Sequence, residues 1–283
     1  MRWKKARRSD NVVDARGGSR GGRLSLAGIA VVVVIGLLSG QDPLQILGQL
    51  ANQSGSLPTQ QDSPAANGDD PQVAFVQAIL GDTEDTWRTL FRQSGGQYRD
   101  PTLVLFRGGV NSACGFASSA VGPFYCPGDQ QVYLDLQFFD EMASRFAVAG
   151  DFAQAYVIAH EVGHHVQTLL GISRQMQAAR QRGARMEGDN GLLVRQELQA
   201  DCFAGVWAYH AQQRHDWLEE GDLEDALNAA SAIGDDRLQQ QSQGRVVPDA
   251  FTHGTSAQRM KWFRTGFDSG EPARCDTFQA SRL

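Results

Sequence analysis

The spacing of apolar residues predicts that most of the chain is helical. In one segment, apolar side chains recur at helical intervals, namely Ala155, Ile158, Val162, Val166 and Leu169. Since Gly150-Asp151 precedes this run and Gly171 follows it, we expect one core helix from Asp151 to about Leu170. Similar patterns predict helices over residues 73–91, 137–147 and 192–210, an exposed helix over 172–190, and mostly helical structure from there to Phe267.

Two short apolar runs are typical of strands. They are Thr102–Phe106 (TLVLF) and Gln131–Leu136 (QVYLDL). No internal repeat is visible. The pattern therefore predicts an α+β fold that is mainly helical with a small sheet, formed by residues 71–283.

A different pattern occupies the front of the chain. The run Leu24–Leu38 has no charged residue, which predicts a transmembrane anchor over residues 24–40 or, alternatively, the apolar region of a cleaved signal peptide. No small-x-small cleavage pattern follows directly, which favours the anchor. Residues 41–70 follow as a predicted flexible linker, polar and rich in Gly, Pro and Ser from residue 52 onward.

Charge gives this anchor an expected orientation. Residues 1–23 carry eight Lys or Arg against two Asp, a net charge of +6, which leaves −12 for the rest of a chain whose total is −6. A basic flank of this kind stays in the cytoplasm, so we expect residues 1–23 to form a cytoplasmic tail and the remaining domain to be exported from a bacterial cell. An acidic domain also argues against nucleic acid as a partner.

The four cysteines agree with an exported domain. An even number of cysteines favours disulfides there, and no C-x-x-C pair suggests a structural zinc site. We expect Cys114 to pair with Cys126 and Cys202 with Cys275, although the sequence permits three connectivities and also four buried free thiols.

The predicted core helix carries the motif His160-Glu161-Val162-Gly163-His164. One helical turn separates the two histidines, so their rings lie on one face and reach a single ion, with Glu161 beside them. Zinc held by two imidazoles and one carboxylate keeps a position open for water, and Glu161 would accept the proton of that water as general base. His165 points about 100° away around the helix, and we interpret it as structural.

A third ligand is expected from a downstream helix. The position where metzincins place a third His is Leu170, which excludes that pattern. Glu197 is the predicted ligand, with Glu187 as a rival, and Asp201 lies one turn after Glu197. A carboxylate at position 201 would accept the free ring N–H of one histidine and fix its tautomer. Small residues around Asp201 would let this helix approach another closely: Ala200, Ala204, Gly205 and Ala208.

Several stretches together resemble one protein family, the bacterial "putative neutral zinc metallopeptidase" family. They are MRWKKARRSDNVVDARG, the CG…PFYCP stretch, VYLDLQFF, YVIAHEVGHHVQ, ELQADCFAGVWA and THGTSAQRMKWFRTG, which cover the chain apart from the linker. The resemblance implies a membrane-anchored, zincin-like domain with peptidase activity. Matched residue by residue, it implies metal binding by His160, His164 and Glu197 and catalysis by Glu161.

The expected reaction is zinc-dependent hydrolysis of a protein or peptide substrate. The tetrahedral oxyanion needs a donor besides zinc, for which Tyr133, Tyr156 and His253 are candidates. The strand at Gln131–Leu136 would pair with an extended substrate if it forms a sheet edge. Two alternatives stay open: an envelope scaffold or assembly factor with a silent zinc site, and a zinc amidase that cleaves a non-peptide cell-wall bond.

Overall fold

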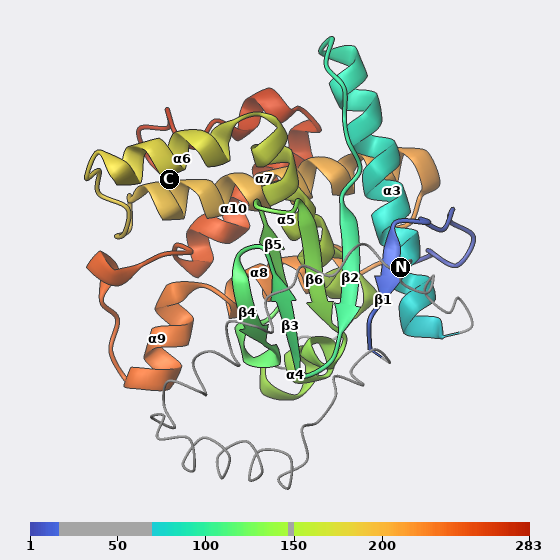
Figure 1. Ribbon diagram of the computed structural model, residues 1–283, viewed down its shortest axis with the longest axis horizontal. Coiled ribbons are helices and arrows are strands. Elements are labelled where there is room, and N and C mark those ends of the chain that lie inside the picture. Colours follow the sequence, from blue (N-terminus) through green and yellow to red (C-terminus); the bar gives the residue numbers. More distant parts are fainter. Residues whose placement is uncertain (17–69, 147–149) are drawn as a thin grey trace, which may run out of the picture. The chain divides into compact units, whose positions relative to one another are not determined.

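The computed structural model describes residues 1–16, 70–146 and 150–283 (Figure 1). The predicted anchor over residues 24–40 lies outside these ranges, as does the predicted linker apart from Asp70. Within the described ranges, no helix has the length and apolar character that crossing a membrane requires.

A four-stranded sheet forms one layer of the molecule. Its order is β1 (Val12–Asp14), β2 (Thr102–Phe106), β6 (Gln131–Asp135) and β5 (Phe124–Cys126). The first three strands run parallel, with Leu103 opposite Val12 on one side and Val132 on the other, and β5 pairs antiparallel with β6. Both predicted strands are therefore confirmed. However, β6 is internal in the described sheet, whose two edge strands are β1 and β5.

A separate hairpin precedes β5. Strands β3 (Gly109–Ser112) and β4 (Gly115–Ser118) pair antiparallel and form a two-stranded sheet. The Cys114–Cys126 disulfide ties the turn of this hairpin to the end of β5. That pairing was expected, and so was the second disulfide, which joins Cys202 to Cys275.

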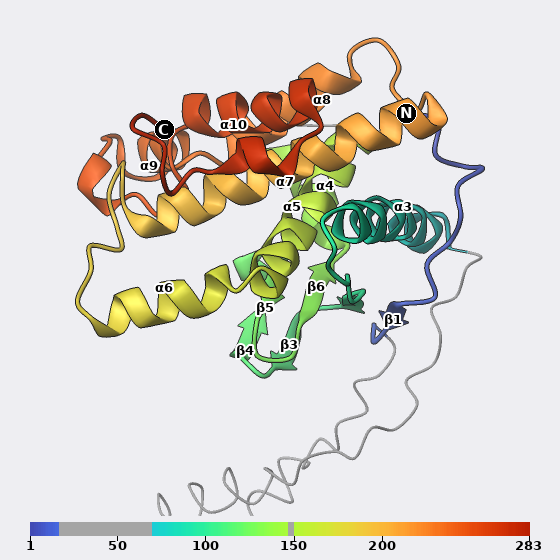
Figure 2. The same cartoon turned by 90° about the horizontal axis from the view of Figure 1, so that it is seen from above.

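Helices cover one face of the sheet in two further layers (Figure 2). Next to the sheet lie α3 (Pro71–Gln93) and α5 (Asp151–Leu169), and beyond them lie α7 (Leu192–His215) and α10 (Ser256–Ser269). The other α-helices of the described residues are α4 (Gln137–Phe146), α6 (Ile172–Gln181), α8 (Asp222–Ala232) and α9 (Asp235–Gln243). The fold is thus mainly helical with a small sheet, as the sequence predicts.

Close packing fixes how α5 and α7 meet. A Cβ added to Gly163 would lie 2.9 Å from the carbonyl oxygen of Ala200, so only glycine permits this helix spacing. On its other side α7 packs against α10, where a Cβ on Gly205 would meet the backbone of Phe263 at 2.0 Å. The central helix α5 is buried between the sheet and these helices, and its Phe152, Val162 and Val166 are at most 1% exposed. Helices packed this closely hold their side chains at fixed separations.

One sequence prediction needs correction, and four strands were missed. The exposed helix expected over residues 172–190 ends at Gln181, because the chain turns at Gly183, whose φ of 74° is left-handed. Strands β1, β3, β4 and β5 were not predicted. They are three or four residues long and rich in Gly, Ser and Asn or isolated from other apolar residues, so they give no clear alternating pattern.

The start of the chain also differs from expectation. Met1–Asp14 belong to the same compact unit as Ala65–Leu283. Trp3 is 9% exposed and packs edge-on against Phe75 of α3, while Val12 enters the sheet as part of β1. This part of the basic tail therefore contributes to the core and does not stand apart from the domain.

Candidate metal centre

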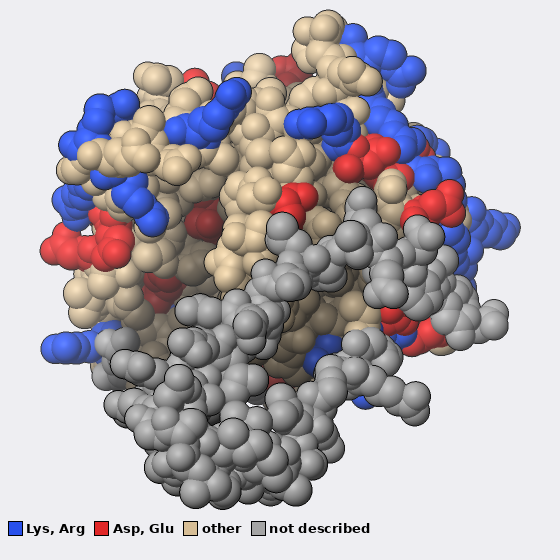
Figure 3. Space-filling model, viewed as in Figure 1, with Lys and Arg blue, Asp and Glu red and all other residues tan. Residues whose placement is uncertain are grey.

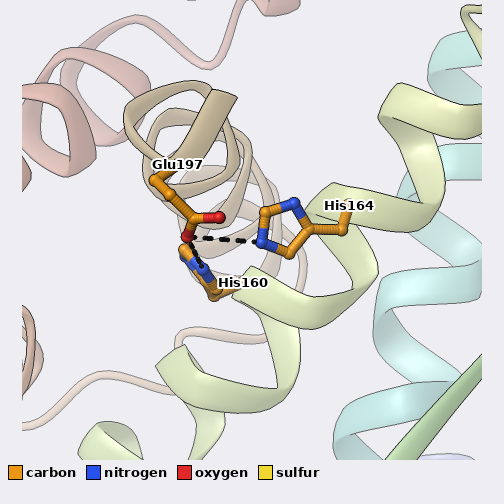
Figure 4. A group of neighbouring side chains, drawn as sticks. All are labelled: His160, His164 and Glu197. Carbon is orange, nitrogen blue, oxygen red and sulfur yellow. Dashed lines mark hydrogen bonds and ion pairs between the residues drawn. The ribbon is translucent and has the colours of Figure 1, made fainter. Parts of the chain in front are cut away.

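Three potential ligand atoms converge where α5 meets α7 (Figure 4). His160 and His164 project from successive turns of α5, and Glu197 faces them from α7. Oε2 of Glu197 lies 3.2 Å from Nε2 of His160 and 3.5 Å from Nε2 of His164. One ligand atom from each residue falls within 4.8 Å of the others, a grouping that could hold a metal ion.

A buried carboxylate holds the far side of the His160 ring. Nδ1 of His160 lies 2.8 Å from Oδ1 of Asp201, one turn after Glu197 on α7. When the ring is neutral, Nδ1–H donates to this carboxylate and Nε2 keeps a free lone pair directed at Glu197. Asp201 therefore lies where it can accept a hydrogen bond from the ring of His160.

Asp201 is in turn held by Arg259 of α10. The guanidinium donates from Nε to Oδ2 at 2.9 Å and from Nη2 to Oδ1 at 2.8 Å, and the side chain is 2% exposed. Tyr156 donates its hydroxyl hydrogen to Asp201 at 2.5 Å and accepts from Arg259. A bidentate, fully buried pair of this kind fixes the orientation of the carboxylate that orients His160.

An amide plays the corresponding part for His164. Nδ1 of His164 lies 2.9 Å from Oε1 of Gln167, three residues later on α5. The amide nitrogen of Gln167 donates to the backbone oxygen of Gln196 and to Oε1 of Gln199. Gln167 is fully buried, and these contacts satisfy both polar atoms of its side chain. Nε2 of His164 points at Glu197.

The charges around this group are strongly coupled. Burial lowers the pKa of His160, but the negative charge of Asp201 and the hydrogen bonds to Asp201 and Glu197 outweigh it and raise this pKa to about 10. Burial raises the pKa of Asp201, yet the charges of Arg259 and His160 bring it down to about 2. Likewise, against the effect of burial, the charge of His164 holds the pKa of Glu197 well below its usual range. Both carboxylates are therefore ionised at neutral pH.

Glu161 differs from these carboxylates. It lies on α5 between the two histidines, is 8% exposed and lines the same cavity as His160 and His164. Burial raises its pKa, although the nearby histidine charges oppose this. A carboxylate with a raised pKa accepts and releases a proton more readily near neutral pH than an ordinary glutamate.

The cavity holding these side chains measures about 530 Å³. The chain leading into and through β5 lines it with Val121, Phe124 and Tyr125, and Ile233 and Leu238 line it as well. Phe138 of α4 adds another apolar surface. The site therefore opens into a mostly apolar groove beside the edge strand β5.

The structure separates the three candidate oxyanion donors. Tyr133 lies in a second apolar cluster, bonds Asp129 through its hydroxyl at 2.8 Å and does not line the cavity. Tyr156 lines the cavity, but its hydroxyl is engaged by Asp201 and Arg259. His253 also lines the cavity, and its side chain is half exposed.

A carboxylate positions His253. Its Nδ1 lies 3.3 Å from Oδ1 of Asp235, the first residue of α9. Oδ2 of Asp235 accepts the backbone N–H groups of Thr252, His253 and Gly254 at 2.6, 2.6 and 3.0 Å. This cradle fixes the loop before α10, and the bond to Asp235 raises the pKa of His253.

Two further residues discussed from the sequence lie outside the group. Glu187 is exposed in the loop between α6 and α7, and the grouping found among the described residues contains Glu197 instead. His165 is 1% exposed, with Nε2 donating to the backbone oxygen of Arg99 at 2.6 Å and Nδ1 3.1 Å from the Tyr125 hydroxyl. Both ring nitrogens thus have protein partners, as a structural histidine requires.

Sequence reasoning missed Arg259, Gln167 and Asp235. A signal existed for Arg259, because Trp262, Phe263 and Gly266 follow it at helical spacing on the buried face of α10, which leaves a charged group on an apolar stripe. Gln167 gives no particular signal, because a polar residue three positions after another on a helix is common. Asp235 follows Gly234 at a helix start, where an acidic residue is common and gives no particular signal.

The residues present fit zinc. Two imidazole nitrogens and one carboxylate oxygen are the ligand set of many catalytic zinc sites, and each histidine has its second nitrogen held by a protein acceptor, as metal-bound histidines usually do. No fourth His, Cys, Asp or Glu joins the group among the residues that the structure describes, which leaves room for water or substrate.

Comparison with known proteins agrees with this geometry. Residues 1–278 match the family model described as "Putative neutral zinc metallopeptidase". The chain is 50% identical over 289 residues to the "Uncharacterized protein YpfJ" of Escherichia coli (strain K12), covering 99% of this chain and all of the relative. It is 45% identical over 219 residues to the "Uncharacterized protein Mb2605" of Mycobacterium bovis, covering 74% and 73% of the two chains.

A protein of Mycobacterium tuberculosis (strain H37Rv), "Uncharacterized protein Rv2575", matches to the same extent, at 45% identity over 219 residues. No solved structure matches. The family model covers nearly the whole chain, including both helices that bear the converging side chains. The chain therefore belongs to the family of putative neutral zinc metallopeptidases.

Proposed function

We propose that this protein is a zinc-dependent peptidase whose centre is formed by His160, His164 and Glu197, with Glu161 as general base. The observation that supports this most is the convergence of Nε2 of both histidines on Oε2 of Glu197 beside the cavity that Glu161 also lines. Zinc bound there would polarise a peptide carbonyl and lower the pKa of a water molecule to about 7.

The chain's own groups account for the proton transfers. Glu161 takes a proton from the attacking water and delivers it to the departing amine, for which a raised pKa is suited. Asp201 keeps the Nδ1 proton of His160 in place, and Arg259 keeps Asp201 ionised and oriented. His253, held by Asp235 at the cavity wall, donates to the oxygen that gains negative charge.

The substrate is an extended peptide that pairs with β5. In the described sheet β5 has only β6 as a neighbour, and residues of β5 line the cavity. Main-chain groups on an unpaired strand edge bind extended peptides irrespective of sequence, whereas pockets select side chains. Because Val121, Phe138 and Leu238 line the groove, we expect preference for apolar side chains near the scissile bond.

The domain acts in an oxidising compartment outside the cytoplasm. Supporting this, all four cysteines of the chain form disulfides. Attachment to a membrane through residues 24–40 stays a prediction from the sequence.

Purified full-length protein tests the proposal. Zinc is counted per chain, and hydrolysis is measured on a library of peptides, before and after removal of metal by a chelator. We expect about one zinc per chain, and activity that is lost with the metal and restored by zinc. Stoichiometric zinc without hydrolysis of any peptide, or hydrolysis that survives metal removal, would contradict the proposal. Peptidoglycan fragments in parallel assays distinguish a cell-wall amidase.

A further inference from the structure

A buried carboxylate on α3 takes its main partners from the start of the chain. Glu84 is 0% exposed, and Nη2 of Arg7 lies 2.7 Å from its Oε2. Ser9 donates its hydroxyl hydrogen to Oε1 at 2.5 Å, and Nδ2 of Asn11 donates to the same oxygen at 2.8 Å. Only Arg88, at 3.8 Å, is a partner from α3 itself. Because a buried polar group is destabilising unless it is hydrogen-bonded or paired, these contacts from the N-terminal segment stabilise Glu84 in its buried position.

The N-terminal segment also makes close packing contacts and hydrogen bonds with α3 and α5 at several points along its length. A Cβ on Gly81 would lie 2.9 Å from the backbone oxygen of Arg7, so a larger residue would displace the segment. The backbone N–H of Ser9 donates to Gln77 at 2.9 Å. The indole N–H of Trp3 donates at 2.7 Å to Asp151, the first residue of the helix that bears the metal-binding motif.

Charge complementarity extends beyond Glu84. Arg2 pairs with Asp216 at 2.8 Å, and Arg7 also pairs with Asp85 at 2.9 Å. Basic and acidic side chains lie next to one another on the side of the molecule where α3 and the N-terminal segment lie (Figure 3). Part of the basic charge from which a cytoplasmic tail was predicted is therefore matched by carboxylates of the domain.

This arrangement constrains the path of the chain. Asp14 ends β1 and Asp70 caps the start of α3, so both ends of the intervening segment are attached to one compact unit. A segment with both ends on one side crosses a membrane an even number of times or not at all. We propose that the N-terminal segment, Arg2–Asp14, lies on the same side of the membrane as the metal-binding domain, and not on the cytoplasmic side opposite an exported domain.

Cysteine labelling tests the shared location without reference to metal or activity. The four native cysteines are in disulfides, so single variants of the full chain each carry one free thiol: Lys5→Cys in the segment and Arg264→Cys on α10, both at exposed positions. A membrane-impermeant maleimide is applied to intact spheroplasts and to lysed ones. The proposal predicts equal behaviour, with both thiols labelled in intact spheroplasts or both only after lysis. Labelling of one thiol alone in intact spheroplasts would overturn it.

A double-mutant cycle tests whether the segment is docked in the full-length protein. Arg7→Gln, Glu84→Gln and the double variant are compared by thermal unfolding, with Lys5→Gln as an exposed basic control. We expect each single change to lower Tm by several degrees, the double variant to lose less than the sum, and the control to match wild type. Additive effects of the two changes would show that the segment is undocked and would also overturn the proposal.

Discussion

At the residue scale, the main feature outside the proposed ligands is the buried ion pair of Asp201 and Arg259. Removing both charges of such a fully buried ion pair from water has a large desolvation penalty. The pair can nevertheless hold neighbouring side chains in one orientation. Here it fixes the acceptor for Nδ1 of His160, so that Nε2 alone is available to a metal. The pair therefore serves the centre although neither member points at the metal position.

Asp201→Asn is expected to weaken zinc binding about 10- to 100-fold, because loss of the outer acceptor of a metal-bound histidine has an effect of this size. The measurement is the zinc dissociation constant, by competition with a chelator. Asp82→Asn is the matched control, since Asp82 is another buried aspartate, bonded to Trp207 and Arg214, that does not contact the centre. Equal zinc affinity in both variants would refute the role of Asp201.

His253 gives a second prediction at this scale. His253→Ala should lower kcat about 10²- to 10³-fold while zinc content and KM change little, because the lost donor acts only on the developing oxyanion. Tyr133→Phe is the control, since Tyr133 was another candidate from the sequence but does not line the cavity. A large loss in the tyrosine variant, or none in the histidine variant, would contradict the assignment.

At the element scale, the centre depends on how closely α5 approaches α7. Gly163 lies between the two histidines in sequence, and its missing Cβ lets the Ala200 backbone come near. The same contact brings Glu197 and Asp201 to the histidine face. The spacing of two helices thus determines the geometry of the ligand group.

Gly163→Ala tests this dependence. Forcing a Cβ against backbone at 2.9 Å should destabilise the fold by about 1–3 kcal/mol and weaken zinc binding, because the helices must separate. Chemical denaturation and chelator competition measure the two effects. Gly96→Ala is the control, as an added Cβ there has its nearest contact at 3.5 Å. Unchanged zinc affinity in Gly163→Ala would mean that the centre tolerates a wider spacing.

The sequence was informative about elements whose apolar positions repeat over several turns or lie in one compact run. Helix α5, with both motif histidines, and strands β2 and β6 follow that rule. Strand β5 could not be found this way, because three residues between Pro123 and Pro127 show no period. Nor could sequence show that β5, and not β6, is the edge strand, since the order of strands depends on the tertiary fold.

At the scale of the whole molecule, distant segments are held together around the centre. The Cys202–Cys275 disulfide joins α7 to the segment that follows α10. The N-terminal segment contacts α3 through Glu84 and the start of α5 through Asp151. The sequence suggested both cysteine pairs. It gave no indication that the segment packs on the domain, because a basic run before an apolar run is also typical of a topology signal.

The two disulfides should contribute unequally to stability. The Cys202–Cys275 bridge closes a sequence separation of 73 residues and the Cys114–Cys126 bridge one of 12. Loop-closure entropy then gives upper values of about 4 and about 3 kcal/mol. Replacing each pair by serines and measuring unfolding free energies tests the ranking. Greater destabilisation from loss of the shorter bridge would contradict it.

The central claim is that Glu161 transfers protons at a zinc centre without binding the metal. The most direct measurement compares Glu161→Gln with wild type in two respects, zinc per chain and the rate of peptide hydrolysis. We predict that the variant retains one zinc per chain and is slower by at least about 10²-fold, the usual minimum for loss of a general base. Hydrolysis at the wild-type rate by the zinc-loaded variant, or loss of zinc together with activity, would contradict the claim.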